Sequence, residues 1–141
     1  MTFQTNRSMP RCTVIPEIAY PDVDQATAWL CDAFGFTVRL RIASHRVQLN
    51  VGDGAVVVKE GAGGESSQAS LTHSVMVRVA NVDAHHERAN QRGARIVRPP
   101  TDYPFGERQY TAGDLAGRSW TFSQTIADVA PEEWGGTSVQ L

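Results

Sequence analysis

The chain has 141 residues, of which 41% are hydrophobic, 20% charged and 8% aromatic. This composition is typical of a globular domain large enough to bury a core without disulfides or metal ions. The 13 Lys and Arg residues against 15 Asp and Glu give a formal net charge of -2, which excludes the basic surface of a nucleic-acid-binding protein. The sequence has no apolar run of membrane-spanning length and no signal-peptide pattern at its start. We therefore expect a cytoplasmic protein without nucleic-acid or membrane partners.

One module is repeated along the chain. Residues 19–26 align with residues 78–85, and Gly35 then falls opposite Gly93, so a spacing of about 58 to 59 residues persists across a strand, a turn and a helix. Each copy predicts the same βαβββ unit. We expect a single domain over residues 1–141, with modules at about 12–60 and 72–125, a flexible linker at 61–71 and a tail at 126–141.

The first module begins with a predicted strand at 13–20. Asp22 or Asp24 can then cap a helix whose apolar residues recur at helical spacing until Gly35 ends it. Predicted strands follow at 37–42, 46–51 and 55–59.

The second module begins with a predicted strand at 74–79, in which Ser74, Met76 and Arg78 alternate with valines and form a polar face. A helix at 82–91 ends at Gly93. Further strands are predicted at 95–98, 108–112 and 119–124.

A specific motif closes the second module. Residues 103–110 read Tyr-Pro-Phe-Gly-Glu-Arg-Gln-Tyr, and residues 114–122 read Asp-Leu-Ala-Gly-Arg-Ser-Trp-Thr-Phe. This ending is similar to that of many bacterial members of the vicinal oxygen chelate superfamily, the glyoxalase, bleomycin-resistance and dioxygenase group. The resemblance covers residues 13–124. It implies an α+β, glyoxalase-like fold in which two βαβββ modules form a cup-shaped, eight-stranded mixed sheet, with a ligand inside the cup and a homodimer as the usual assembly.

The resemblance also implies where a metal would bind, on the first and last strands of the modules. The matching positions are Ile15, Val57, Ser74 and Thr121. None is a usual ligand, and a first-row metal needs three or four N, O or S donors. Glu17 shares the face of Ile15 and could join donors elsewhere, but we expect no metal or other cofactor.

Several side chains are candidates for a site. Glu17 lies on an otherwise apolar strand, where it could be a general base with a raised pKa or could pair with Arg78 or another basic residue across the cup. Arg108 could bind a ligand carboxylate or phosphate, or could pair with Glu107 or Asp114. The predicted ligand-binding residues, which include aromatic rings suited to a flat molecule, are Tyr103, Phe105, Arg108, Tyr110, Trp120 and Arg78.

Three functions remain open. The first is metal-free binding or sequestration of a small aromatic or antibiotic-like molecule. The second is an enzyme, namely a lyase, isomerase or dioxygenase. It would use either a metal ion or, as general base, Glu17. The third is a structural module without a ligand, because a fold alone does not establish a function.

Overall fold

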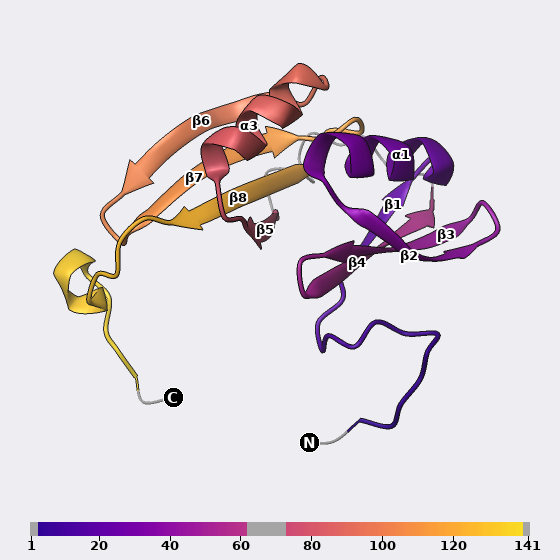
Figure 1. The fold of residues 1–141 in the computed structure, drawn as a ribbon, viewed down its shortest axis with the longest axis horizontal. Helices are drawn as coiled ribbons and strands as arrows, with labels where there is room; N and C mark the ends of the chain where they lie inside the picture. Colours follow the sequence, from indigo (N-terminus) through magenta and orange to yellow (C-terminus); the bar gives the residue numbers. More distant parts are fainter. Residues whose placement is uncertain (1–2, 62–72, 140–141) are drawn as a thin grey trace. The chain divides into compact units, whose positions relative to one another are not determined.

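The protein is described here by a computed structural model that covers residues 3–61 and 73–139. It divides into two compact units, Met1–Glu65 and Ser66–Leu141, and each contains one βαβββ copy (Figure 1). The predicted linker at 61–71 lies outside the described residues except for Gly61. No helix in the described ranges is long and apolar enough to cross a membrane.

The first unit is a four-stranded mixed sheet covered on one face by a helix (Figure 1). Strand β1 is parallel to β4, and the other neighbours are antiparallel, in the order β1-β4-β3-β2. The elements are β1 (Glu17–Tyr20), α1 (Val23–Phe34), β2 (Thr37–Ile42), β3 (Arg46–Val51) and β4 (Gly54–Glu60).

Helix α1 has the ends that the sequence predicts. The Asp22 side chain accepts a hydrogen bond from the Gln25 backbone N–H at 3.0 Å, which satisfies one free donor of the first turn. Gly35 ends the helix with a φ of 80°, a left-handed conformation that glycine adopts without strain. The helix packs its apolar stripe against the sheet, with Ala26 and Leu30 fully buried.

Strand β1 is shorter than predicted. The sequence suggested a strand from residue 13, but the ladder starts at Glu17. Val14 is exposed, and Pro16, which has no N–H, contributes only its carbonyl, which accepts from Val57 N at 2.9 Å. Pairing of the strand therefore begins after the proline.

The second unit repeats this architecture in the order β5-β8-β7-β6, with β5 parallel to β8. Helix α3 covers one face of the sheet (Figure 1). The elements are β5 (Val75–Arg78), α3 (Val82–Gln91), β6 (Arg95–Tyr103), β7 (Glu107–Gly113), β8 (Ser119–Thr125) and the 3-10 helix η1 (Pro131–Trp134). The α+β class, the two βαβββ modules and the eight strands predicted from the sequence are thus confirmed.

Strand β6 is longer than predicted. We expected it to end at Arg98, but it continues through Pro99 and Pro100 to Tyr103. Strand β6 is at the edge of its sheet, where a proline can face away from the ladder. The register with β7 is irregular between Arg98 and Thr101, so the prolines are accommodated there.

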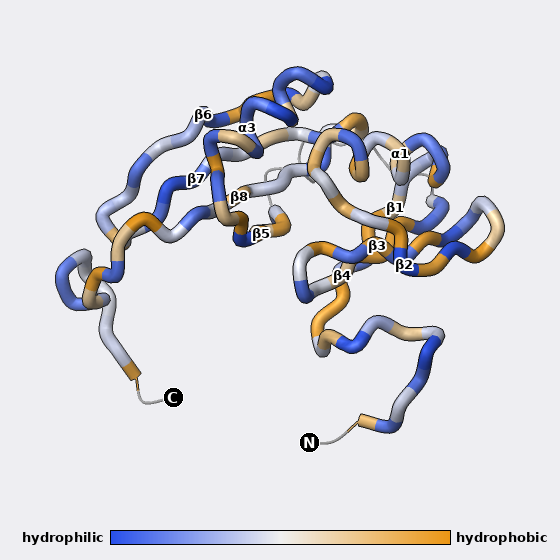
Figure 2. Tube along the Cα trace, viewed as in Figure 1, coloured by the Kyte–Doolittle hydropathy of each residue, from blue (hydrophilic) through white to orange (hydrophobic). Residues whose placement is uncertain are grey.

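The two faces of the second sheet differ in character, because side chains alternate along each strand. The face toward α3 carries fully buried Tyr110, Trp120 and Phe122. Figure 2 shows α3 as largely hydrophilic, and only Val82 and Ala89 of this helix are buried. We call the opposite side the polar face, and it carries Ser74, Met76, Arg78, Glu107, Gln109, Thr111, Ser119, Thr121, Ser123 and Thr125.

Candidate functional site

Three hydroxyl groups, one each from β7, β8 and the residue before β5, meet on the polar face. The register places Thr111 of β7 opposite Thr121 of β8, and their hydroxyl oxygens are 3.1 Å apart. The Ser74 hydroxyl lies 3.4 Å from that of Thr121 and donates to the Ser119 carbonyl at 3.2 Å. A hydroxyl both donates and accepts, so this row can hydrogen-bond to carbonyl or hydroxyl groups of a ligand.

A second polar row lies next to the hydroxyl row. The Gln109 amide donates to Ser123 Oγ at 3.0 Å, and the Ser123 hydroxyl donates to Glu107 Oε1 at 2.6 Å. Hydrogen bonds from Ser123 and Thr125, with a smaller contribution from the Arg78 charge, lower the pKa of Glu107 below its ordinary value. Glu107 is therefore an anion at neutral pH, held in one position by its neighbours.

Arg78 supplies the positive charge of the polar face. Its Nη2 donates to the Thr125 hydroxyl at 3.4 Å, a long contact that engages one of five donors. The side chain is exposed, and on the same strand Met76 is 62% exposed. The polar face therefore offers a planar cation, a carboxylate, hydroxyls and an accessible apolar side chain on neighbouring strands.

The positions that would hold a metal do not fit one. Ile15 and Val57 have no donor atoms, and Ser74 and Thr121 present hydroxyls that hydrogen-bond to each other. Neutral hydroxyls are weak substitutes for the imidazole, thiolate and carboxylate ligands of first-row metals. Among the described residues, no three His, Cys, Asp or Glu side chains form a group that could hold a metal ion.

Glu17 is a paired carboxylate in the first unit. Its oxygens lie 2.5 Å from Arg46 Nη2 and 3.6 Å from Lys59 Nζ. The hydrogen bond from Arg46 and the Lys59 charge lower the pKa of Glu17, so the raised pKa considered for a general base is wrong. Glu17 does pair with basic residues, as the alternative expected, but the partners are Arg46 and Lys59 of the same sheet rather than Arg78 or another residue across the cup. A catalytic role of Glu17 stays a prediction, and its lowered pKa weighs against it.

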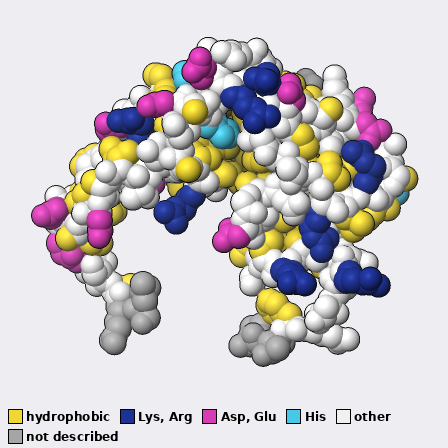
Figure 3. All heavy atoms as spheres, viewed as in Figure 1, with side chains coloured by type: hydrophobic (Ala, Val, Ile, Leu, Met, Phe, Trp, Pro, Cys, Tyr) yellow, Lys and Arg dark blue, Asp and Glu magenta, His cyan; other side chains and the backbone are white. Residues whose placement is uncertain are grey.

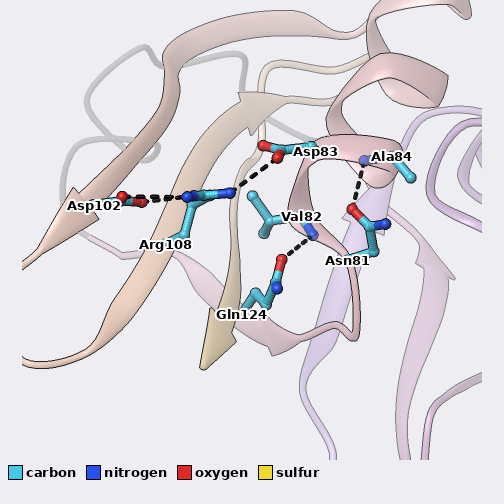
Figure 4. Close-up of polar contacts among 7 residues, drawn as sticks. All are labelled: Asn81, Val82, Asp83, Ala84, Asp102, Arg108 and Gln124. Carbon is cyan, nitrogen blue, oxygen red and sulfur yellow. Dashed lines mark hydrogen bonds and ion pairs between the residues drawn. The ribbon is translucent and has the colours of Figure 1, made fainter. Parts of the chain in front are cut away.

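Arg108 lies on the side of the sheet that faces α3 (Figure 4). Its Nε is 2.6 Å from Asp102 Oδ1 on β6, and its Nη1 is 3.0 Å from Asp83 Oδ2 in the first turn of α3. Of the two roles considered for Arg108, pairing with carboxylates of the protein is therefore favoured over binding a ligand. The partners are Asp102 and Asp83 rather than Glu107 or Asp114. Arg108 joins β6, β7 and α3, and two carboxylates already occupy its guanidinium.

The start of α3 is fixed by two further hydrogen bonds (Figure 4). The Asn81 side chain accepts from Ala84 N at 3.0 Å as an N-cap. The Gln124 side chain on β8 accepts from Val82 N at 2.8 Å. These bonds hold the helix over the sheet face opposite the polar face.

Tyr110 and Trp120 are core residues, so their predicted role in ligand contact stays a prediction that their burial weighs against. Both are 0% exposed. The Tyr110 hydroxyl contacts Nδ1 of His85 on α3, and burial raises the pKa of Tyr110. The indole Nε1 of Trp120 donates to Asp114 Oδ2 at 3.0 Å. Their rings fill the space under α3, where a ligand on the polar face cannot touch them.

Tyr103 and Phe105 remain accessible aromatic residues. Tyr103 is the cross-strand partner of Glu107, so the two share a face. The Tyr103 and Phe105 rings stack with centroids 5.3 Å apart, and Phe105 contacts Trp134 of the tail at 5.2 Å. This stack borders the polar face and can contact a flat ligand at its edge.

The structure thus brings together three of the six predicted ligand-binding residues, Arg78, Tyr103 and Phe105, on one side of the second sheet. Sequence reasoning did not select the neighbouring Glu107, Gln109, Thr111 and Ser123 for this role. The signal for three of them is the period-two alternation of polar and apolar residues along 109–112 and 119–123. The motif drew attention to the aromatic and basic residues of these strands instead.

Comparisons with known proteins place this architecture in a family. Residues 11–122 match the model of the Glyoxalase/Bleomycin resistance protein/Dioxygenase superfamily. The chain is 34% identical to TioX from Micromonospora sp. ML1, whose crystal structure matches 84% of this chain and 100% of that one with a TM-score of 0.68.

More distant crystal structures share the fold. A family member from Burkholderia phytofirmans PsJN is 17% identical, with a TM-score of 0.64 over 79% of this chain and 97% of that one. One from Alicyclobacillus acidocaldarius is 14% identical, with a TM-score of 0.68 over 84% of this chain and 95% of that one. No curated protein matches the chain. From the family model and the similarity to TioX, the chain belongs to the glyoxalase/bleomycin resistance protein/dioxygenase superfamily.

Proposed function

We propose that the protein binds and sequesters a small aromatic, antibiotic-like molecule on the polar face, without a metal. One observation carries the proposal. Where a metal-dependent relative would place ligands, this chain has two aliphatic side chains and the hydroxyls of Ser74 and Thr121, which join Thr111 in a hydrogen-bonded row. Such a row suits the oxygen atoms of an organic molecule better than a metal ion.

The neighbouring side chains indicate what kind of molecule fits. Arg78 can donate to a carbonyl or an anionic oxygen, and Glu107 can accept from a ligand hydroxyl or amine. Met76, which is exposed, can pack against a ring, as can the stack of Tyr103 and Phe105. A flat, oxygen-rich aromatic compound satisfies all of these groups.

The family supports this reading without establishing it. Its description includes bleomycin resistance proteins, and sequestration in that manner requires binding but no chemical step. The general-base alternative requires a carboxylate ready to accept a proton, whereas the pKa of Glu17 is lowered by its two basic neighbours. The geometry therefore favours a binding protein over an enzyme.

Calorimetric titration with a panel of aromatic antibiotics and aromatic metabolites tests the proposal. We expect at least one compound to bind, and Arg78→Gln to weaken it about tenfold, which corresponds to about 1.4 kcal/mol for a charge-assisted hydrogen bond. Thr121→Val removes the central hydroxyl and should weaken binding as well.

Arg88→Gln on α3 is the matched control, because it removes one positive charge from the element that covers the other face. It should bind like the unaltered protein. The proposal fails if no compound binds to the folded protein at high micromolar concentration, or if Arg78→Gln and Thr121→Val bind every ligand unchanged.

We also propose that the protein is a homodimer. Each sheet ends in edge strands, which natural proteins usually cover or protect, and two-fold dimers are the commonest soluble oligomers. Sedimentation velocity at micromolar concentration should give the mass of two chains. A monomer at that concentration would refute the dimer while leaving the binding proposal intact.

A further inference from the structure

The C-terminal tail that follows β8 is anchored to the turn between β6 and β7. The N–H groups of Ile126 and Ala127 both donate to the Gly106 carbonyl, at 2.8 and 3.2 Å. The Val129 side chain would lie 3.3 Å from a Cβ added at Gly106, so it also packs on the turn. The tail is therefore held beside the end of the sheet at which β8 finishes (Figure 1).

Helix η1 gives the tail a defined shape. The Gly136 N–H donates to the Pro131 carbonyl at 2.8 Å, and the Glu132 carboxylate accepts from the Ser138 N–H at 2.7 Å. These bonds within the tail fix the position of its one tryptophan, Trp134.

Trp134 contacts the aromatic stack but stays accessible. Its ring centroid lies 5.2 Å from that of Phe105, and the two planes are tilted by 54°. Tyr103 stacks on Phe105 with an interplanar angle of 12°, and its hydroxyl accepts from Arg98 Nη1 at 2.7 Å. Trp134 is 43% exposed, so much of the indole is available to a ligand. We call Tyr103, Phe105 and Trp134 the aromatic cluster.

The tail around this cluster carries only negative charge. Residues 119–141 contain Asp128, Glu132 and Glu133 but no Lys or Arg. Figure 3 shows Asp and Glu side chains gathered around η1, next to hydrophobic ones. Carboxylates repel an anionic group, so the cluster suits the uncharged ring system of a ligand rather than its acidic end.

A cross-strand row joins Arg78 to the aromatic cluster. Arg78 donates to the Thr125 hydroxyl, Thr125 lies opposite Glu107, and Glu107 lies opposite Tyr103. Thr125 is on β8 and Tyr103 on β6, so two strand spacings, about 10 Å, separate them. An acidic end at Arg78 and a ring system at the cluster can therefore belong to one molecule.

The length of the row indicates the size of that molecule. Trp134 lies beyond Phe105 in the chain of ring contacts that starts at Tyr103. We therefore expect a single ring held at Arg78 to fall short of Trp134, and two or three fused rings to reach it.

We propose that Trp134 contacts the ligand, and that the tail makes the polar face specific for a fused aromatic molecule with an acidic group at one end. The inference rests on the function proposed for the polar face and adds the size and polarity of the ligand. The tail follows the region that the family model matches, residues 11–122. The contact with Trp134 is therefore additional to the part of the chain matched by the family model.

Calorimetry with benzoate, 2-naphthoate and anthracene-2-carboxylate tests the size of the ligand. The three acids carry the same polar group, so differences in affinity report on the ring system. We expect anthracene-2-carboxylate to bind at least about tenfold more tightly than benzoate.

Trp134→Ala should weaken anthracene-2-carboxylate about fivefold, as expected for the loss of one aromatic pair, and should weaken 2-naphthoate less. Trp134→Phe keeps a ring and should retain most of the affinity. Val139→Ala is the matched control, because Val139 is another exposed apolar side chain of the tail, and it should bind all three acids unchanged.

The indole N–H signals in two-dimensional NMR spectra report the contact directly. The chain has three tryptophans, and the signal that is missing in Trp134→Phe belongs to Trp134. Titration with anthracene-2-carboxylate should shift this signal in step with the calorimetric binding curve. The signal of Trp29, on α1 in the first unit, should stay in place.

An unchanged affinity in Trp134→Ala, or a Trp134 signal that stays in place while the acid binds, would overturn the inference. Binding that Arg78→Gln does not weaken would also overturn it, because the acid would then contact the tail without the polar face. The proposed function is judged separately, by the panel of antibiotics and metabolites. A panel compound that binds through Arg78 without moving the Trp134 signal would refute the role of the tail alone, whereas failure of every compound and all three acids to bind would refute both.

Discussion

Replacing Asp114 by Ala is expected to lower the free energy of unfolding by about 3 kcal/mol, because it removes several hydrogen bonds to a buried charged group. The buried carboxylate accepts from the backbone N–H groups of Ala116 and Arg118, both at 2.9 Å, through Oδ1. Its Oδ2 accepts from the indole of fully buried Trp120 at 3.0 Å. The substitution removes the acceptor of the buried indole N–H and releases the turn that joins β7 to β8.

Urea unfolding followed by circular dichroism measures this loss. Asp53→Ala is the matched control, because Asp53 is exposed in the turn before β4, and it should change the free energy of unfolding by less than about 0.5 kcal/mol. A cost below about 1 kcal/mol for Asp114→Ala would mean that the network does not hold the turn.

Gly106→Ala is the second substitution with a large expected effect, about 3 kcal/mol or more, because a backbone strain and a steric clash combine. Gly106 has a φ of 84°, and an added Cβ would lie 2.2 Å from the Ala127 carbonyl oxygen. The Gly106 carbonyl also accepts from Ile126 N at 2.8 Å. The chain that leaves β8 therefore cannot move away without losing this bond.

Gly117→Ala separates the two causes. Gly117 has a φ of 78° but open space around an added Cβ. Only the backbone penalty of about 1–2 kcal/mol should apply there. Thermal unfolding of both variants measures the difference, and equal losses would show that the contact with Ala127 does not constrain Gly106.

Local signals in the sequence explain why the elements could be predicted. Asp22 and Gly35 are strong helix-end residues, and the apolar stripe between them has helical spacing. The strand ends were less predictable. The effect of Pro99 and Pro100 depends on whether their strand is at an edge, and that is a property of the whole sheet.

The candidate site could be predicted only in part, because the face of a strand is set by its register. Arg108 and Tyr110 have the same parity along β7 as buried Ala112, yet their residue types suggested ligand contact. One of the two partners of Arg108, Asp83, is on a helix whose placement over the sheet could not be derived from local patterns.

The metal content of the protein tests the central claim, binding without a metal, most directly. Elemental analysis of the natively purified protein should be repeated after incubation with zinc, nickel, manganese and ferrous iron, followed by gel filtration. We predict no stoichiometric metal under any of these conditions, because Ile15, Val57, Ser74 and Thr121 do not supply the donors that a first-row metal needs. One tightly held metal ion per chain would contradict the account and would make a metal-dependent enzyme the better hypothesis, with Glu17 as the first ligand to examine.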